Sequence, residues 1–295
     1  MPSNLSKLVA KNLAKPPHGL DDQVQFEVMM GSFAYGVSSD TSDLDVYGFA
    51  IPNKELVFPH LAGEIEGFGT KGQRFEVYQQ HHIDDGRKIW DYQIYNIVKY
   101  FHLVMQNNPN MLDSLFVPER CILHMTPVGA KVRAFRRKFL HKRSWHTFKG
   151  YAFQQTHKMR TKAPTDKSKR KEMVEEFGYD VKFAYHVVRL LNEVEQILTE
   201  GDLDLERSRE QLKAIRRGDW TLGEVEQYFK DKERELEAVY TKSELPWGPD
   251  EPAIKALLLE CLEDHFTTLK DCVVSVEKER QALMDIKTIL NRLGL

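Results

Sequence analysis

The sequence predicts an α+β fold, in which a small mixed β-sheet with flanking helices is followed by a mostly helical domain. Two observations lead to this prediction. Short apolar runs broken by glycine, proline and polar turns fill the first 120 residues, which is the pattern of strands. After Pro118 the apolar residues recur at helical spacing. A chain of 295 residues is long enough for two domains, which we place at 1–120 and 121–295.

The first domain is organised around residues 26–52. Residues 26–30 form an apolar run that predicts a buried strand ending at Gly31-Ser32. Residues 43–51 predict a second strand, which Pro52 stops. The two strands therefore enclose a segment of small, aromatic and turn-forming residues.

Two aspartates on the second strand indicate a metal site. Alternate side chains of a strand share a face, so Asp43 and Asp45 point the same way, roughly 6–7 Å apart along the backbone. They repel each other unless a cation lies between them, and Mg²⁺ takes oxygen ligands of this kind. Gly31 lets the backbone approach a ligand closely, and Ser32 adds a hydroxyl. Together these residues predict a metal-bound nucleoside triphosphate.

The remaining elements follow from the same periodicities. We expect a short amphipathic helix at 6–13, strands at 75–78 and 89–94, and helices at about 95–106, 111–116, 144–159, 172–199, 221–240 and beyond 251. Residues 53–72 are expected to be a connection, and 81–86 a polar stretch between strands. We interpret the histidines and aspartates of that stretch as plain surface rather than as a transition-metal site.

The string GSFAYGVSSDTSDLDVYG at residues 31–48 resembles a known signature. Gly31-Ser32, Ser42-Asp43 and Asp45 match the GS, spacer, DxD pattern of the DNA polymerase beta-like nucleotidyltransferases. The fuller string resembles one branch of that superfamily, the predicted nucleotidyltransferases that include RNA-ligase-associated proteins of phages and bacteria. A lone DxD is more typical of a solvated turn, but this spacing between two apolar runs favours the superfamily.

The resemblance implies a third carboxylate beside the signature pair, and Asp91 stands at the matching place. It would act as a shared metal ligand or as general base, whereas the residues alone leave a helix N-cap equally open. Asp113 matches a position where Glu is common in the branch and is a weaker candidate. The resemblance thus implies Mg²⁺ or Mn²⁺ on Asp43, Asp45 and Asp91, and nucleotide contacts from Gly31, Ser32 and Ser42.

Residues 178–191 carry a second resemblance, to the GYDxKxAYHxxRLL helix of the same branch. Lys182, His186 and Arg189 follow at i, i+4 and i+7 and form one polar stripe. Such a stripe binds triphosphate oxygens or faces solvent, and the resemblance favours nucleotide binding. Arg216 lies in a segment similar to the branch's IRxGxW and would reach the nucleotide or pair with an acid.

Lysine and arginine are concentrated between residues 131 and 171. The run 158–171 alone holds seven basic residues and one acid. A solvated loop of this composition needs no partner, whereas a phosphate-tracking patch would bind RNA with release of counterions. We favour the RNA patch, because it adjoins a basic helix.

The overall composition excludes several classes. The formal net charge is −2, so no global field draws the chain onto nucleic acid. Three cysteines, Cys121, Cys261 and Cys272, are too few and too scattered for a disulfide framework, which fits a reducing cytoplasm. No apolar run approaches the ~18 residues that a membrane span needs. We therefore expect a cytoplasmic protein without membrane association.

These observations predict a metal-dependent nucleotidyltransferase, with its active site in the cleft between the two domains. It would transfer a nucleoside monophosphate from an NTP to an acceptor hydroxyl and release pyrophosphate. We expect an RNA end of the tRNA type as acceptor, in nucleic-acid repair or modification. Nucleotidylation of a protein or small molecule is the alternative. A noncatalytic nucleotide sensor is disfavoured because both signature aspartates are present.

Overall fold

The computed structural model describes residues 2–39, 42–58, 75–161 and 174–266, together with single positions near the C-terminus. Its centre is a mixed sheet that has five strands within those ranges, in the order β3-β4-β2-β1-β5. β2 and β4 run parallel, and the other neighbouring pairs run antiparallel. The strands are β1 (Val24–Met29), β2 (Leu44–Ala50), β3 (Val77–Asp84), β4 (Ile89–Asn96) and β5 (Ile122–Met125).

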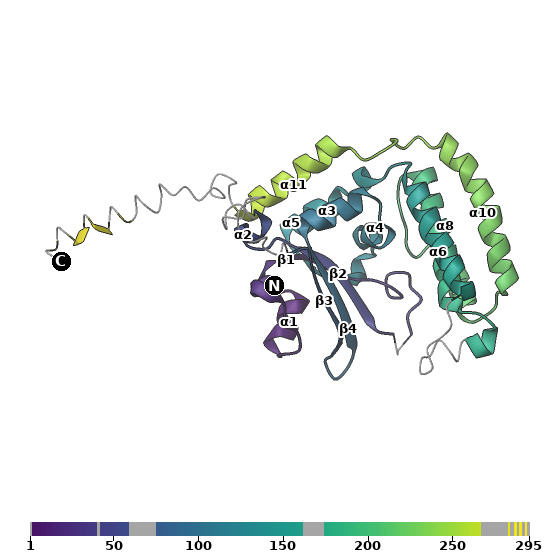
Figure 1. Ribbon diagram of the computed structural model, residues 1–295, viewed down its shortest axis with the longest axis horizontal. Helices are drawn as coiled ribbons and strands as arrows, with labels where there is room; N and C mark the ends of the chain where they lie inside the picture. The colour runs from purple at the N-terminus through teal and green to yellow at the C-terminus, as the bar shows by residue number, and fades with distance from the viewer. Residues whose placement is uncertain are drawn as a thin grey trace.

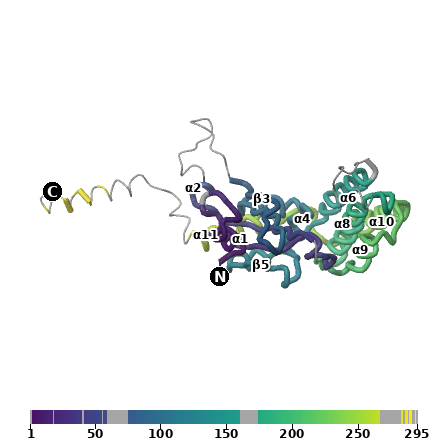
Figure 2. Tube along the Cα trace, turned by 90° about the horizontal axis from the view of Figure 1, so that it is seen from below, coloured from purple at the N-terminus to yellow at the C-terminus, as the bar shows by residue number. Residues whose placement is uncertain are grey.

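Helices lie on both sides of this sheet (Figure 1). The view from below in Figure 2 shows the same row of layers, from α1 through the sheet and α4 to α6, α8 and α10. The helices are α1 (Asn4–Ala10), α2 (Lys54–Val57), α3 (Ile97–Met105), α4 (Pro109–Phe116), α5 (Pro127–Ala134), α6 (Ser144–Thr161), α8 (Val181–Glu200), α9 (Arg209–Arg216), α10 (Leu222–Lys242) and α11 (Glu251–Phe266), with 3₁₀ turns at Pro17–Gln23, Glu119–Cys121 and Arg136–Phe139. The α+β class predicted from the sequence is confirmed.

The two faces of the sheet have different characters. Val46 and Tyr92 lie in a buried cluster with Leu5 and Leu8 of α1, so α1 covers that face. Because side chains alternate along a strand, the neighbouring Asp45 points to the opposite face, which is the side of α6 and α8. The sheet therefore presents Asp45 to the helical half of the chain.

One hydrophobic cluster runs continuously from the sheet into the helical half. It includes Phe26 and Phe49 of the sheet as well as Val187 and Leu191 of α8. β5 follows the domain boundary that we predict at residue 120, yet it pairs with β1 in the sheet. α11 returns from α10 and packs against α3 and α5. The two halves therefore share one core.

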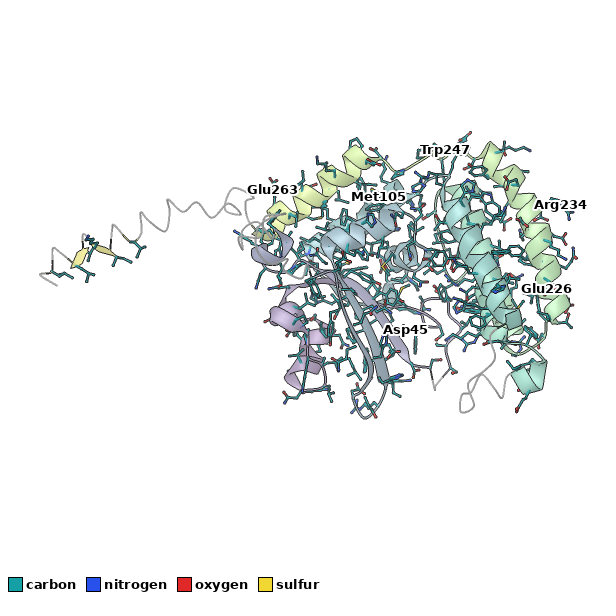
Figure 3. All side chains as sticks on the ribbon, viewed as in Figure 1. Asp45, Met105, Glu226, Arg234, Trp247 and Glu263 are labelled. Atoms are coloured by element: carbon teal, nitrogen blue, oxygen red, sulfur yellow. The ribbon has the colours of Figure 1, made fainter. Side chains whose placement is uncertain are left out.

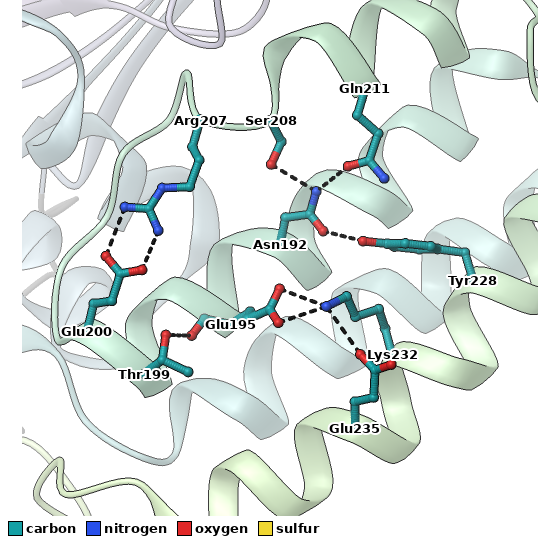
Figure 4. A network of polar contacts seen from close by, with 10 residues as sticks. All are labelled: Asn192, Glu195, Thr199, Glu200, Arg207, Ser208, Gln211, Tyr228, Lys232 and Glu235. Atoms are coloured by element: carbon teal, nitrogen blue, oxygen red, sulfur yellow. Dashed lines mark hydrogen bonds and ion pairs between the residues drawn. The ribbon is translucent and has the colours of Figure 1, made fainter.

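Polar contacts dock α9 and α10 on α8 (Figure 4). The Asn192 amide donates to Ser208 Oγ at 3.0 Å and to Gln211 Oε1 at 2.7 Å. The Tyr228 hydroxyl of α10 donates to Asn192 Oδ1 at 2.6 Å, and Lys232 pairs with Glu195 at 2.7 Å. No helix in the described part of the chain is long and apolar enough to cross a membrane.

Two expectations about the β3–β4 hairpin are wrong. Residues 81–84 belong to β3, because an irregularity between Gln80 and Ile83 with a positive φ of 57° at His82 lets the strand continue past the polar residues. Asp91 lies inside β4 and is no helix N-cap. The helix N-cap is Asn96, whose side chain accepts from the Val98 N–H at 2.9 Å.

A buried carboxyl group holds α1 on the sheet. Glu27 is 0% exposed in the middle of β1 and accepts the backbone N–H groups of Asn4 at 2.6 Å and Leu5 at 2.9 Å. These amides belong to the first turn of α1, where helix N–H groups have no partner within the helix. Burial raises the pKa of Glu27 to about 7 in spite of these hydrogen bonds.

This raised pKa predicts a pH dependence of stability. The folded chain binds the Glu27 proton more tightly than the unfolded chain, whose pKa is near 4.5. The stabilising contribution is therefore complete below pH 4.5 and is lost as the pH rises through about 7. Between about pH 5 and 8, we expect the free energy of unfolding of the wild type to fall by on the order of 3 kcal/mol relative to Glu27→Gln. Urea denaturation measures it, and parallel pH curves for the two proteins would contradict it.

Candidate active site

Two carboxylates face each other across the parallel pair β2–β4. Asp45 and Asp91 are register partners, and neighbouring strands lie about 4.8 Å apart. Asp43 is exposed two residues before Asp45, directly ahead of β2. Burial raises the pKa of Asp45, and the nearby Asp91 and Asp43 raise it further, while Lys182 opposes the shift. The three predicted acids and Lys182 are thus close enough to act on one another.

The turn after β1 lies directly against Asp45, which Figure 3 labels on the sheet. Gly31 has a φ of +59°, and a Cβ built there would lie 2.3 Å from Asp45 Oδ2. The preceding Met30 N–H donates to the Asp45 carbonyl at 2.7 Å. Only glycine fits this position, for backbone and for side-chain reasons at once. The Gly-Ser turn and the aspartate therefore form one structural unit.

The two serines of the signature lie at opposite ends of this loop. Ser32 is half-buried, and its carbonyl accepts from the Val37 N–H at 2.9 Å. Ser42 Oγ accepts from the Ser39 N–H at 2.9 Å, so it closes a turn immediately before Asp43. Both serines therefore make hydrogen bonds within the loop that approaches the acids.

The hairpin strand β3 holds Asp91 in place. The His82 N–H donates to Asp91 Oδ1 at 2.7 Å, and His81 Nδ1 lies 3.6 Å from the same oxygen. His81 also lowers the pKa of Asp45. Sequence reasoning missed this histidine, because only the bulged register of the hairpin brings it beside Asp91.

The three residues of the predicted stripe on α8 lie in different surroundings along the helix axis. Lys182 is exposed in the first turn, where it acts on Asp45, and Asp180 caps the helix by accepting the Lys182 N–H at 2.9 Å. His186 is half-buried and stacks edge-on with the Tyr185 ring at 4.8 Å. Arg189 is only 4% exposed. Of this stripe, Lys182 is the residue that acts on Asp45.

Arg189 lies in a buried ion cluster. Its Nη1 is 2.6 Å from Asp113 Oδ2 and 2.8 Å from Glu193 Oε2, and it donates to the Tyr35 hydroxyl at 2.9 Å. Tyr35 in turn donates to Asp113 Oδ2 at 2.7 Å. Burial raises the pKa of both carboxyl groups. Arg189 thus has a structural role through Nη1, and its role in triphosphate binding stays a prediction.

The ion cluster and two further arginines fix the loop after β1. Tyr35 ties it to α4 and α8, as described above. The Arg216 guanidinium donates to the Val37 carbonyl at 2.7 Å, so this residue supports the loop, and its contact with a nucleotide stays a prediction. Arg120 donates to the Phe33 carbonyl at 3.0 Å and pairs with Glu206. Arg216 and Asp113 are thus supporting residues.

The donor set fits a hard divalent cation. Within the described residues, no three His, Cys, Asp or Glu side chains converge into a preassembled metal centre. Mg²⁺ does not need one, because it is usually held by one or two carboxylates together with substrate phosphates and water. Asp43 and Asp45 offer such carboxylates, and the missing side chain at Gly31 leaves the Asp45 oxygens accessible.

A sequence model of the RNA repair pathway DNA polymerase beta family matches residues 5–260. The chain belongs to this family. Among solved structures it is similar to a nucleotidyltransferase-like protein from Exiguobacterium sibiricum 255-15, with 9% identity, 98% of this chain and 90% of that chain covered, and a TM-score of 0.29. No curated protein matches the chain. The family assignment confirms the resemblance read from the GS and DxD residues and supports a polymerase beta-like nucleotidyltransferase linked to RNA repair.

Replacing Gly31 tests the link between the turn and the acids. In Gly31→Ala the new methyl group must displace the Asp45 carboxylate, so we expect Mn²⁺ binding in the presence of ATP to weaken by roughly tenfold. Electron paramagnetic resonance of Mn²⁺ measures it. Gly86→Ala is the matched control, because Gly86 also has a positive φ, of +82°, but nothing lies within 4 Å of its Cβ position. Equal affinities of the two variants would contradict the link.

Replacing Arg189 tests the ion cluster. Arg189→Met leaves two buried carboxyl groups without their cation, and we expect it to lower the free energy of unfolding by about 3–5 kcal/mol at pH 8. The loss shrinks at pH 5, where the carboxyl groups can take up protons. Lys182→Met removes an exposed charge from the same helix and should change stability by about 0.5 kcal/mol or less. Urea denaturation compares them, and similar stabilities would refute a structural role.

Proposed function

We propose that this protein transfers a nucleoside monophosphate from a Mg²⁺-bound NTP to a hydroxyl group at an RNA end. The observation that carries the proposal is the register pairing of Asp45 with Asp91, with Gly31 against the Asp45 carboxylate and Lys182 acting on it. A polymerase beta-like family linked to RNA repair supports the same reaction. The site combines cation ligands, a glycine turn for phosphates and a positive side chain.

The chain's own residues supply binding and positioning. The turn at Gly31-Ser32 approaches the triphosphate with its backbone, and Lys182 offsets the negative charge that grows on the departing pyrophosphate. Asp43 and Asp45 would hold the cation. Bound Mg²⁺ neutralises phosphate charge and makes the acceptor hydroxyl more acidic.

The transfer itself is a substitution at the α-phosphorus. The acceptor oxygen forms a bond to this atom while the bond to the β-phosphate oxygen breaks, and pyrophosphate leaves with the electron pair. The hydroxyl proton passes to a base, for which we propose Asp91. Its Oδ1 is held by the His82 N–H, so the carboxylate is already oriented within β4.

The basic residues between 131 and 149 largely serve the fold. Lys131 pairs with Glu260 at 2.6 Å, Arg137 with Asp202 at 2.5 Å and Lys149 with Glu233 at 2.8 Å. Arg133 donates to the Leu115 and Val117 carbonyls at the end of α4. The predicted basic patch at 131–171 is thus partly consumed by internal contacts, and residues 162–173 lie outside the described part of the chain.

Label transfer tests the proposal. With Mg²⁺ and each α-³²P-labelled NTP, we expect label on RNA ends with the wild type, and a loss of about 100-fold or more with Asp45→Asn, which removes a ligand charge while keeping the side-chain shape. Asp22→Asn, an exposed aspartate in the turn before β1, should be fully active. Label on protein, or pyrophosphate release without labelled RNA, would move the acceptor to another class. Equal activity of Asp45→Asn and wild type would overturn the mechanism.

A further inference from the structure

A cavity lies away from the acids, where the end of α3, the first turns of α6 and the start of α11 meet. It has a volume of about 570 Å³, and its wall includes Gln106, His141, Arg143, Tyr151 and Glu251. Figure 3 labels Asp45 and also Met105, which belongs to the cavity wall. The two residues lie apart in that view. No part of the proposed reaction uses this cavity.

His141 gives this cavity a hydrogen-bonding requirement. It is 2% exposed, and its Nε2 lies 3.0 Å from the Met105 carbonyl, so this nitrogen must carry the ring proton. Nδ1 is then a bare acceptor, and it has no partner among the described residues. Ser144 Oγ, one turn further on, is also buried without a partner there. Buried polar atoms are nearly always paired, and of these two residues His141 belongs to the cavity wall, so its Nδ1 calls for a group that donates.

The other wall residues define the class of that ligand. Arg143 is exposed at the cavity and suits a phosphate, whereas the Gln106 amide and the Glu251 carboxylate suit the polar edge of a base. The Tyr151 ring offers a stacking surface, and the Asn108 amide fixes its hydroxyl at 2.8 Å. A donor for His141, an anion for Arg143 and a flat ring for Tyr151 occur together in one ribonucleotide.

A row of polar and aromatic side chains connects the cavity to the acids. On the site face of the sheet, Tyr47 and Gln93 form the register pair two residues beyond Asp45 and Asp91. Tyr95 follows, and its hydroxyl donates to Gln93 at 3.0 Å. Burial raises the pKa of Tyr95, and nearby Tyr151 adds to the shift, so the sheet and the cavity wall are neighbours. Four residues of strand separate Asp91 from Tyr95, or about 13 Å.

We propose that this cavity binds a nucleotide of the single-stranded RNA acceptor, a few nucleotides from the end that lies at the acids. The inference rests on the proposed function and names the acceptor surface that the function requires. The strand would run along the polar row, with an internal base against Tyr151 and its phosphate at Arg143. Single strands are bound in this way by stacking surfaces combined with positive charge.

RNA binding without NTP or metal tests the cavity separately from catalysis. The probe is a 12-nucleotide single-stranded RNA of mixed sequence, measured by fluorescence anisotropy at several salt concentrations. We expect Arg143→Gln to weaken binding roughly fivefold at 0.1 M salt and to reduce the salt slope by about 0.7, the value for one phosphate contact on a single strand. Lys138→Gln is the matched control, an exposed charge on the same segment outside the cavity wall, and should weaken binding less than about twofold.

A second measurement needs no substitution near the cavity. In ¹⁵N-labelled protein, the Nδ1 resonance of His141 should shift when the RNA is added, because a new hydrogen bond forms there. Asp43→Ala/Asp45→Ala abolishes transfer and should leave both the RNA affinity and this shift unchanged. Transfer by that double variant would therefore refute the proposed function while leaving the cavity result standing.

Four outcomes would overturn the cavity proposal. They are equal losses for Arg143→Gln and Lys138→Gln, absence of RNA binding by the wild type, an unchanged His141 resonance at saturating RNA, and an Arg143→Gln effect confined to the KM for NTP. The last outcome would assign the cavity to a free mononucleotide, as would a His141 shift caused equally by UMP alone.

Discussion

The Arg189 guanidinium joins the parts of the molecule on which the candidate site depends. It contacts carboxylates from α4 and α8 and the hydroxyl of Tyr35 in the loop after β1. An unpaired charge in the protein interior costs free energy. The four groups of this cluster can therefore separate only if this region of the protein unfolds locally. Tyr35 is four residues from Gly31, and Arg189 is two helical turns from Lys182. The buried cluster therefore sets the spacing between the glycine turn and the lysine that flank the acids.

The acids themselves lie close together with too little positive charge nearby to balance them. Asp43 and Asp91 lie near Asp45 with Lys182 as a nearby positive side chain, and burial raises the pKa of Asp45, to which the two acids add. A free triphosphate would meet net negative charge here, whereas a triphosphate that carries its cation would relieve it. The same crowding favours an NTP–metal complex over either component alone. Gly31 makes the crowding possible, because any side chain there would occupy the place of the Asp45 carboxylate.

Local patterns in the sequence predict much of this arrangement, since the strands around Gly31 and Asp45 have apolar alternation that depends only on near neighbours. The pairing of Asp45 with Asp91 depends on a parallel register between strands 46 residues apart, which no local pattern contains. Arg189 shows another limit. Lys182 and Arg189 share an angular position on α8, yet they lie about 10 Å apart along its axis, and only the second is covered by Tyr35 and α4. Sequence periodicity predicts which residues share one side of a helix. It does not predict which other parts of the chain cover each turn of that side. Glu27 is similar, because its amide partners are 22 and 23 residues away.

The distribution of positive charge limits how this protein can bind RNA. The chain is slightly acidic overall, and several cations of the basic segment neutralise carboxylates or cap helix carbonyls of the same chain. Such cations add little to counterion release, so affinity for the phosphate backbone alone must be modest in the described part of the chain. Under the proposed function, recognition would come from stacking and hydrogen bonds to unpaired bases, which distinguish a single-stranded end from a duplex. A repair enzyme would gain from this balance, because a damaged end would be held by its exposed bases while intact helices, which offer mainly phosphates, would be released.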